Sequence, residues 1–220
     1  MKTPILLIYV GLLIVLTGCY LTEDAADVNQ ERISVQYCTV FNGTRQSTSV
    51  ETAFKFGHTP LHLSNPIYFE NGQLFEKRNP ISGIYYQRQL TGIRSGSYEW
   101  TDETGRVFNN QVELFTFVLV NPPNSLKKKT STLINWEGDL IPYSQGTFSV
   151  TITSKITGVS CSFYLGETLR ITPDHLDFLP AGEARFEIAR KHSEPIDEGT
   201  QAGGDSWVSY VHELDINIIE

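Results

Sequence analysis

Ile33-Ser34-Val35-Gln36-Tyr37-Cys38-Thr39-Val40-Phe41 is the stretch of sequence that decides the fold. Its apolar residues Ile33, Val35, Tyr37 and Phe41 fall on one face of an extended chain, because successive side chains of a strand point to opposite sides. Most of the intervening residues are polar. The stretch therefore predicts a β-strand with one buried face and one more polar face.

The same period of two recurs along the chain, at 50–56 and in the long alternation over 208–218. Asn71-Gly72 separates two further apolar runs and predicts a two-residue hairpin turn. Leu114 to Val120 is almost continuously apolar, which predicts a strand buried on both faces. Since no apolar stripe of helical period extends over several turns, the sequence predicts an all-β protein.

Short strands bounded by Gly, Pro and Asn are typical of antiparallel β-sandwiches. Pro122-Pro123 leaves about 90 residues on each side, the size of one immunoglobulin-like module. We therefore predict two such sandwiches in tandem, at 32–122 and 131–220, joined by a linker at 123–130. One large β-sandwich is the alternative that the pattern leaves open.

The first residues predict a secretion signal, with Lys2 followed by an apolar run from Ile5 to Leu16. That run has 12 residues, whereas a membrane-spanning helix needs about 20. The next residues, Leu16-Thr17-Gly18-Cys19, resemble the lipobox of bacterial lipoproteins. This resemblance implies that 1–18 is a cleaved signal peptide and that Cys19 is acylated. Acyl chains would then hold the mature protein on a membrane, at about 0.8 kcal/mol per buried CH₂.

Residues after the cysteine bear on the location. Tyr20 stands where the aspartate would be in the enterobacterial pattern for retention on the inner membrane, so the resemblance implies an outer-membrane address. Residues 19–31 are polar and acidic and predict a flexible tether. The acidic run resembles the surface-export signals of some lipoproteins, and it equally suits a solvated linker. The periplasmic side and the cell surface both stay open.

The succession of strands also resembles the tandem immunoglobulin-like modules of Gram-negative surface lipoproteins, although no Cys…Trp…Cys framework is present. The formal net charge of −8 argues against nucleic acid as a partner, because neutralising phosphates requires clustered Lys and Arg. The one basic run, Lys127-Lys128-Lys129, lies in the predicted linker. The expected partners are a membrane, held through Cys19, and an envelope protein or a glycan.

Metal and cofactor sites are not predicted. The pair His58 and His62 has helical ligand spacing, but Pro60 between them opposes a helix. Acidic residues that suit calcium by type lack the dense alternation of a dedicated loop. These acidic residues are Asp174, Asp177, Asp197, Glu198 and Asp205.

Catalytic motifs give no positive signal either: the sequence holds no G-x-S-x-G, no H-E-x-x-H and no phosphate-binding glycine loop. Ser206, His212 and Asp215 have the residue types of a triad, but a single strand would carry all three and keep them apart. Paired carboxylates of a glycoside hydrolase stay open, since their separation is three-dimensional. We predict a protein that is not an enzyme, with a hydrolase as the less favoured alternative.

Two cysteines remain besides Cys19. Cys161 alternates with Phe163 and Leu165, which predicts a core thiol, whereas Cys38 lies on the more polar face of its strand. Opposite environments oppose a disulfide between them, but sequence alone does not fix the geometry, and the pairing stays open.

Aromatic residues are the last candidates for a site. Trp136 follows an apolar pair and predicts a core residue, as do most aromatic residues of a sandwich. Trp207 is out of phase with Val208 and Tyr210, so it should face outward and is the candidate ligand-binding residue. Together these patterns predict an envelope lipoprotein with a binding or assembly role, with a surface glycan-binding protein as the alternative.

Overall fold

The computed structural model describes residues 22–80, 83–139, 146–166 and 168–220. The predicted signal peptide and Cys19 lie outside these residues. Over the described residues the chain is all-β, with three short 3-10 helices, η1 (Ala25–Asp27), η2 (Gln30–Arg32) and η3 (Pro173–His175), as its only helical turns. The strands of these described residues form one large sheet and two small ones. The predicted all-β sandwich class is confirmed.

The large sheet runs through both halves of the chain. Its strands, in spatial order from one edge, are β15 (Ser160–Leu165), β14 (Gly146–Ser154), β17 (Gly182–Pro195), β18 (Gly204–Ile219), β2 (Ile33–Asn42), β3 (Ser47–Phe56), β8 (Gly83–Thr91) and β7 (Phe75–Asn79). Three short strands pair at its margins: β4 (Thr59–His62) with β3, β1 (Glu23–Asp24) with β4, and β12 (Ser125–Lys127) with β18.

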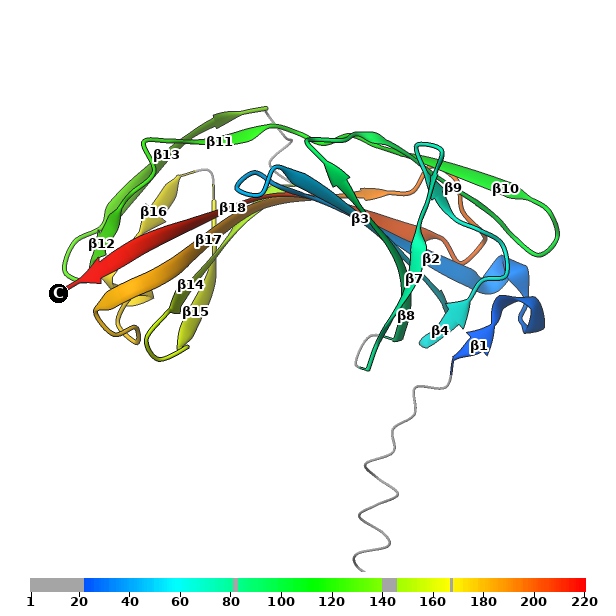
Figure 1. Cartoon of the computed structure of the whole chain (residues 1–220), viewed down its shortest axis with the longest axis horizontal. Coiled ribbons are helices and arrows are strands. Elements are labelled where there is room, and N and C mark those ends of the chain that lie inside the picture. Colours follow the sequence, from blue (N-terminus) through cyan, green and yellow to red (C-terminus); the bar gives the residue numbers. More distant parts are fainter. Residues whose placement is uncertain (1–21, 81–82, 140–145, 167) are drawn as a thin grey trace, which may run out of the picture.

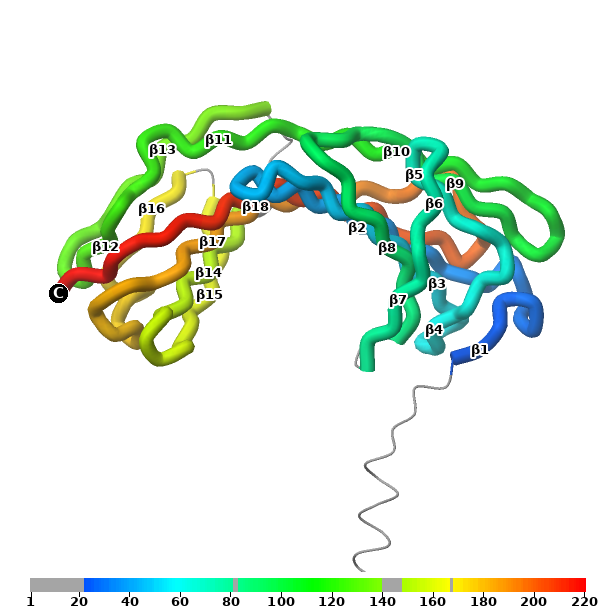
Figure 2. The backbone as a smooth tube through the Cα atoms, in the orientation of Figure 1, coloured from blue at the N-terminus to red at the C-terminus, as the bar shows by residue number. Residues whose placement is uncertain are grey.

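Two small sheets cover one face of the large sheet. The first contains β10 (Val107–Val112), β9 (Gly96–Thr101), β5 (Tyr68–Phe69) and β6 (Gly72–Gln73), and the second contains β11 (Phe117–Val120), β13 (Thr132–Gly138) and β16 (Leu169–Ile171). Figures 1 and 2 show an arch in which the small sheets lie along the outer, upper side and the large sheet lies beneath them. We call the lobe with β1–β10 the first lobe and the lobe with β11–β17 the second lobe.

The core of the first lobe forms where the alternation of β2 and β3 meets the first small sheet. Tyr37 stacks on Tyr98 with 4.5 Å between ring centroids, and Phe54 meets Trp100 edge-on at 4.8 Å. All four side chains are buried. The face that the sequence pattern assigned to the core is therefore the face that the small sheet covers.

The core of the second lobe has an aromatic cluster around a buried cation. Phe117 packs edge-on against Trp136 and Phe148. The guanidinium of Arg190 lies 4.6 Å from the Trp136 ring centroid and donates a 2.6 Å hydrogen bond to the carbonyl of Asp139. Trp136 is half-buried and packs against the core, as its sequence context predicts. A buried charge needs such partners, because desolvation without them is costly.

The two lobes are joined by hydrogen-bonded strands rather than by a single connecting segment. Strand β18 pairs with β2 in parallel over eight residue pairs, from Gly204 opposite Val35 to Val211 opposite Asn42. At Gly204 a Cβ atom would stand 2.2 Å from the carbonyl oxygen of Val35, so this backbone approach requires glycine. The predicted linker at 123–130 contains β12, which pairs with the end of β18. The two-module prediction did not include this shared sheet.

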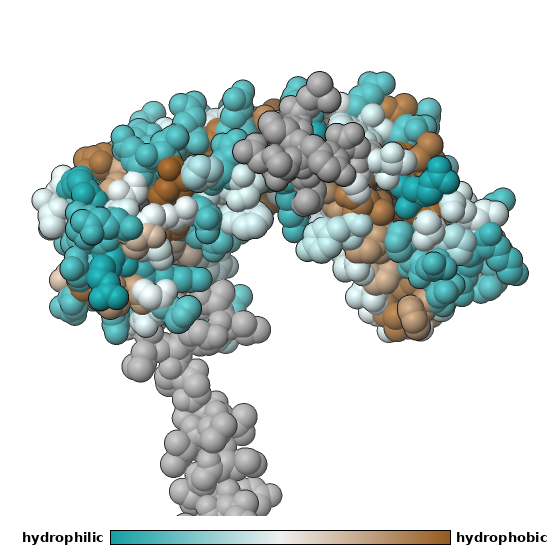
Figure 3. All heavy atoms as spheres, turned by 180° about the vertical axis from the view of Figure 1, so that it is seen from behind, coloured by the Kyte–Doolittle hydropathy of each residue, from teal (hydrophilic) through white to brown (hydrophobic). Residues whose placement is uncertain are grey.

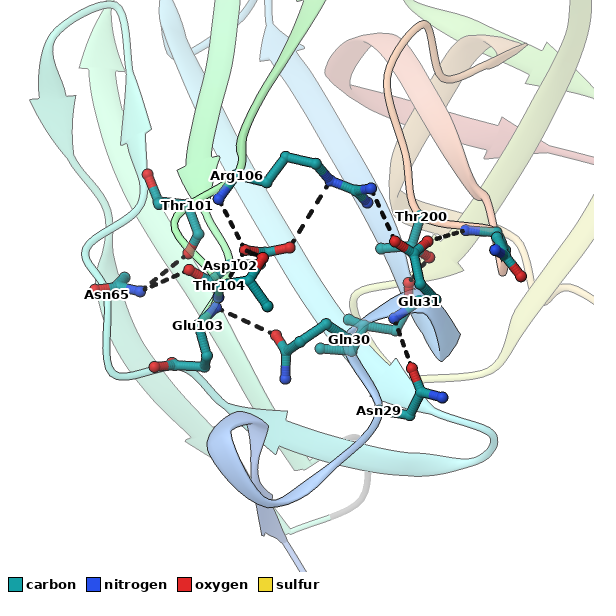
Figure 4. A network of polar contacts seen from close by, with 12 residues as sticks. Asn29, Gln30, Glu31, Asn65, Thr101, Asp102, Glu103, Thr104, Arg106 and Thr200 are labelled. Atoms are coloured by element: carbon teal, nitrogen blue, oxygen red, sulfur yellow. Dashed lines mark hydrogen bonds and ion pairs between the residues drawn. The ribbon is translucent and has the colours of Figure 1, made fainter.

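Part of the predicted tether is folded. Residues 23–32 form β1, η1 and η2, and Ala25 is buried. Figure 4 shows how η2 is held: Arg106 donates to Glu31 at 2.9 Å, and the backbone N–H of Glu103 donates to the side chain of Gln30. Polar side chains of this segment form hydrogen bonds with neighbouring loops. Composition alone does not distinguish such a folded polar segment from a solvated, flexible one.

Two local predictions need correction. The hairpin predicted at Asn71-Gly72 forms, but its turn residues are Glu70 and Asn71, both at positive φ, one position earlier. The run from Leu114 to Val120 is not buried on both faces: within β11 the side chain of Val118 is 51% exposed. Strand β11 belongs to a small sheet on the outer side of the arch, so one of its faces meets solvent.

Candidate functional site

The large sheet has one face that no other sheet covers, and we call it the uncovered face. It is formed by the alternate residues that point away from the small sheets, and it lines the hollow side of the arch, visible between the lobes in Figure 3. Its central residues are Ser34, Gln36, Cys38 and Val40 on β2, Ser49, Glu51, Ala53 and Lys55 on β3, and Asp205, Trp207, Ser209 and Val211 on β18. Hydroxyl, amide and charged groups predominate there.

Trp207 lies on this face, near the middle of the sheet. Its side chain is 41% exposed, whereas Val208 next to it is buried, so the predicted outward orientation is confirmed. Trp207 stands opposite Cys38 on one side and Ser193 on the other. An indole at this position offers a flat apolar surface and one N–H donor in polar surroundings, the combination that suits a binding residue.

A half-buried carboxylate lies in the same cross-strand row. Glu51 is opposite Cys38 on β2 and Gln87 on β8. The side-chain amide of Gln87 donates to Glu51 at 3.1 Å and to the hydroxyl of Ser49 at 3.1 Å. Burial raises the pKa of Glu51 above its ordinary value, against the opposing effect of these hydrogen bonds. The row therefore presents a carboxylate held in place by an amide.

The thiol of Cys38 is not activated. Burial, and secondarily the charge of Glu51, raise the pKa of Cys38 to about 11. The thiolate is the nucleophilic form, so at neutral pH this thiol is protonated and unreactive. Cys38 therefore contributes a small, soft surface beside Trp207 and no nucleophile.

A depression lies next to this row, where β18 begins. It has a volume of about 310 Å³ and is lined by Ser34, Val35, Gln36, Ala53, Lys55, Ala202, Gly204 and Asp205. Asp205 precedes Trp207 by two residues on the same face, which puts their Cα atoms about 7 Å apart. The depression combines an ammonium, a carboxylate, an amide and a hydroxyl, so it suits a neutral polar ligand better than a strongly charged one.

Further aromatic side chains lie on the same face. Phe75 on β7 is 61% exposed and shares the cross-strand row of Trp207, through Gln87 and Glu51. Tyr164 on β15, at the opposite edge, is 75% exposed. Exposed aromatics thus occur at the centre and at both edges of the uncovered face, on strands from both lobes. Tyr86, Tyr98, Trp100 and Tyr210, by contrast, are buried.

The triad residue types are kept apart, as predicted from their places on one strand. Ser206 is buried on the covered side, His212 contacts the carbonyl of Phe117 at 2.8 Å, and Asp215 pairs with Lys155 at 2.8 Å. No base stands beside the serine hydroxyl among the hydrogen bonds of the described residues.

Two of the residues weighed as metal ligands, His62 and Glu198, have other partners. His62 contacts Glu76 at 2.7 Å, while His58 lies in an exposed turn. Glu198 accepts a 2.6 Å hydrogen bond from the backbone of Asn109. Within the part of the chain that the structure describes, no three His, Cys, Asp or Glu side chains are grouped as metal ligands. The same residues contain no helix of the length and hydrophobicity needed to cross a membrane.

Cys38 and Cys161 are both free thiols. Three strands, β18, β17 and β14, lie between β2 and β15 in the sheet, which separates the two cysteines by at least about 19 Å at 4.8 Å per strand. A disulfide needs Cα atoms within about 7 Å. Cys161 packs against the core and its thiol contacts the carbonyl of His175, in agreement with its predicted side of the strand.

Comparisons with known proteins add little. No family model matches the chain, and no curated protein matches it. A solved structure described as "Structural insight into host cell surface retention of a 1.5-MDa bacterial ice-binding adhesin" is similar at 9% identity and a TM-score of 0.21. The match covers 87% of this chain and 66% of that chain, just under two thirds of its length. A likeness this weak supports no argument about function.

Sequence reasoning identified Trp207 but missed its neighbours. Glu51, Gln87 and the depression-lining Gln36 and Lys55 come from three separate stretches of sequence, β2, β3 and β8, that only strand pairing brings together. The signal in the sequence was the set of polar residues that alternate with the apolar ones in each strand. These residues mark the uncovered face, but they do not show which strands are neighbours on it.

Proposed function

We propose that this protein is a lipid-anchored protein of the bacterial outer membrane that binds an envelope component through the uncovered face of its large sheet. The observation that carries the proposal is the exposed Trp207, set among polar side chains in the middle of that face. Large aromatic residues dominate binding energy when they sit at the centre of a contact surface. The role is binding or assembly rather than catalysis.

The shape and the charge of the face support a binding role. A hollow side lined by eight strands offers a ligand contacts from both lobes at once. Lys55 and Asp205, which carry opposite charges, both line the depression. Near Cys38 the charges of Glu51 and Lys191 act on the thiol pKa in opposite directions. A surface with both signs of charge and many hydroxyl groups gains specificity from hydrogen bonds rather than from net charge.

The anchor part of the proposal rests on the lipobox resemblance at Leu16-Thr17-Gly18-Cys19. Cys19→Ser should move the protein from the outer-membrane fraction to the soluble fraction, because the acyl chains would be lost. Protease treatment of intact cells, followed by blotting for the C-terminal half, would then distinguish the cell surface from the periplasmic side.

The binding part is tested by photo-crosslinking in intact envelopes. A photoreactive amino acid at position 207 should yield a discrete adduct that the same residue at position 118 does not yield. Val118 is the matched control, because it is 51% exposed but lies on β11, on the outer side of the arch. Equal labelling at the two positions, or none at 207, would refute binding through the uncovered face.

A glycan is the second candidate ligand. Trp207 beside the polar depression favours it, since sugar rings stack on aromatic faces while their hydroxyls bond to amides and carboxylates. On a glycan array the protein should bind a defined saccharide, and Trp207→Ala should weaken that binding. If no saccharide binds while the crosslink at position 207 is a protein, the ligand is a protein and the assembly role is favoured.

A further inference from the structure

The far end of the second lobe has an exposed apolar tip. It consists of Ile156 and Val159 in the turn between β14 and β15, and of Phe178 in the loop before β17; their side chains are 70%, 43% and 86% exposed. Figure 3 shows hydrophobic residues at the lower end of the lobe on the right, which is this tip seen from behind. An almost fully exposed phenylalanine at a loop end is unfavourable in water, so a contact is expected to cover it.

The tip is held by packing and backbone hydrogen bonds. Leu176 and Leu179 on either side of Phe178 are buried, and the N–H of Leu179 donates to the carbonyl of Leu176. The turn is tied to β17, because the backbone N–H of Lys155 donates to the carbonyl of Glu183 at 2.9 Å. Its exposed side chains are therefore presented on a folded support and are preorganised for contact.

The position of the tip relative to the N-terminus suggests what covers it. In Figures 1 and 2 the turn between β14 and β15 lies at the lower end of one lobe, and β1 lies at the lower end of the other. Thr22, just before β1, follows Cys19 by three residues. An extended chain spans at most about 3.6 Å per residue, so Cys19 lies within about 11 Å of Thr22. A bilayer that holds the acyl chains must therefore lie close to the end of the first lobe that carries β1, on the side of the arch where the tip also lies.

We propose that Ile156, Val159 and Phe178 insert into the surface of the membrane that anchors Cys19. This inference rests on the proposed lipid anchor and adds a second point of attachment at the other lobe. Two attachments fix the orientation of the arch: its uncovered face, with Trp207, is turned toward the membrane. The ligand would then be a component at the membrane surface, held between the two lobes.

The chemistry of the tip fits lipid contact through apolar insertion. The one basic residue of the turn, Lys155, is paired with Asp215 at 2.8 Å, and Asp174 and Asp177 flank the loop of Phe178. Attraction to anionic headgroups is therefore weak, and burial of the three apolar side chains provides the contact. Such a contact should persist at high salt, which screens exposed charges but not apolar burial.

The test uses the full lipidated chain in vesicles of phosphatidylethanolamine and phosphatidylglycerol that contain brominated phosphatidylcholine, whose bromine quenches tryptophan at short range. Phe178→Trp places a reporter in the tip, and Val118→Trp places a control on the outer side of the arch. After subtraction of the signal of the unsubstituted protein, the reporter at 178 should be quenched at least about twofold more than the control, and raising the salt concentration should not change this difference.

The outcomes separate the two proposals. A chain that floats with the vesicles but shows equal quenching at 178 and 118 overturns the membrane contact and leaves the anchor intact. A chain that does not float refutes the anchor and, with it, this inference. Ile156→Ser together with Val159→Ser should reduce the quenching of the reporter at position 178. Unchanged quenching would show that Ile156 and Val159 do not take part in the membrane contact.

Discussion

Truncation of one buried side chain in the second lobe should destabilise both lobes, because they share the large sheet. Phe186 on β17 is fully buried, and Phe→Ala at such a site costs about 3–5 kcal/mol. For a chain of this size each kcal/mol lowers the unfolding temperature by about 2–4 °C. Phe186→Ala should therefore lower it by about 6–20 °C. The whole calorimetric transition should move as one, since the eight residue pairs between β18 and β2 couple the lobes.

The matched experiment places the same change in the first lobe. Phe54 on β3 is also fully buried, so Phe54→Ala should shift the same single transition by a similar amount. Phe178→Ala is the control, because its side chain is 86% exposed and surface changes usually stay within about 0.5 kcal/mol. A second transition that stays at the unsubstituted temperature in either core variant would show that the lobes unfold independently, and the coupling argument would be refuted.

Three further predictions concern particular side chains. Burial alone would raise the pKa of Asp102, but hydrogen bonds from Thr104 and Arg106 outweigh this effect and lower the pKa below its ordinary value. The stability that this carboxylate provides is therefore present above about pH 4 and is lost as the pH falls through the lowered pKa. Asp102→Ala should therefore cost about 1–3 kcal/mol in urea unfolding at neutral pH, and a cost that persists in acid would contradict this role. Trp207→Ala should weaken ligand binding at least about tenfold in titration while changing stability by less than about 1 kcal/mol, and unchanged affinity would remove Trp207 from the site. Burial raises the pKa of Cys38 to about 11, so this thiol should react slowly with iodoacetamide in the folded protein. In urea it should react quickly even when no reductant is added, because it is a free thiol. If the reaction in urea required a reductant, Cys38 would be in a disulfide.

The sequence pattern predicts which side of each strand is buried more reliably than it predicts which strands are neighbours. Ile33, Val35, Tyr37 and Phe41 all face the core, and Trp207 faces away from it, because alternation follows directly from the pleat of a strand. The parallel pairing of β18 with β2 joins residues about 170 positions apart, and no local pattern specifies such a partner. The shared sheet and the hollow shape of its uncovered face were therefore not predicted.

The candidate site shows the same division. The orientation of Trp207 was predictable from its phase relative to Val208 and Tyr210. Its setting was not, since two strand pairings separate Trp207 from Glu51 and a third leads on to Gln87. The folded N-terminal segment was missed for another reason: Gln30 and Glu31 are polar because they bond to the loops at 103–106 and 200–202, and a polar composition by itself suggests solvation.

The anchor at Cys19 is the claim on which the proposed location and orientation depend, and intact mass spectrometry of the protein extracted from membranes tests it most directly. The account predicts a chain that begins at Cys19 and is heavier than its amino-acid sequence by the mass of attached acyl groups. A chain of unmodified mass, or one that begins at any other residue, would contradict it.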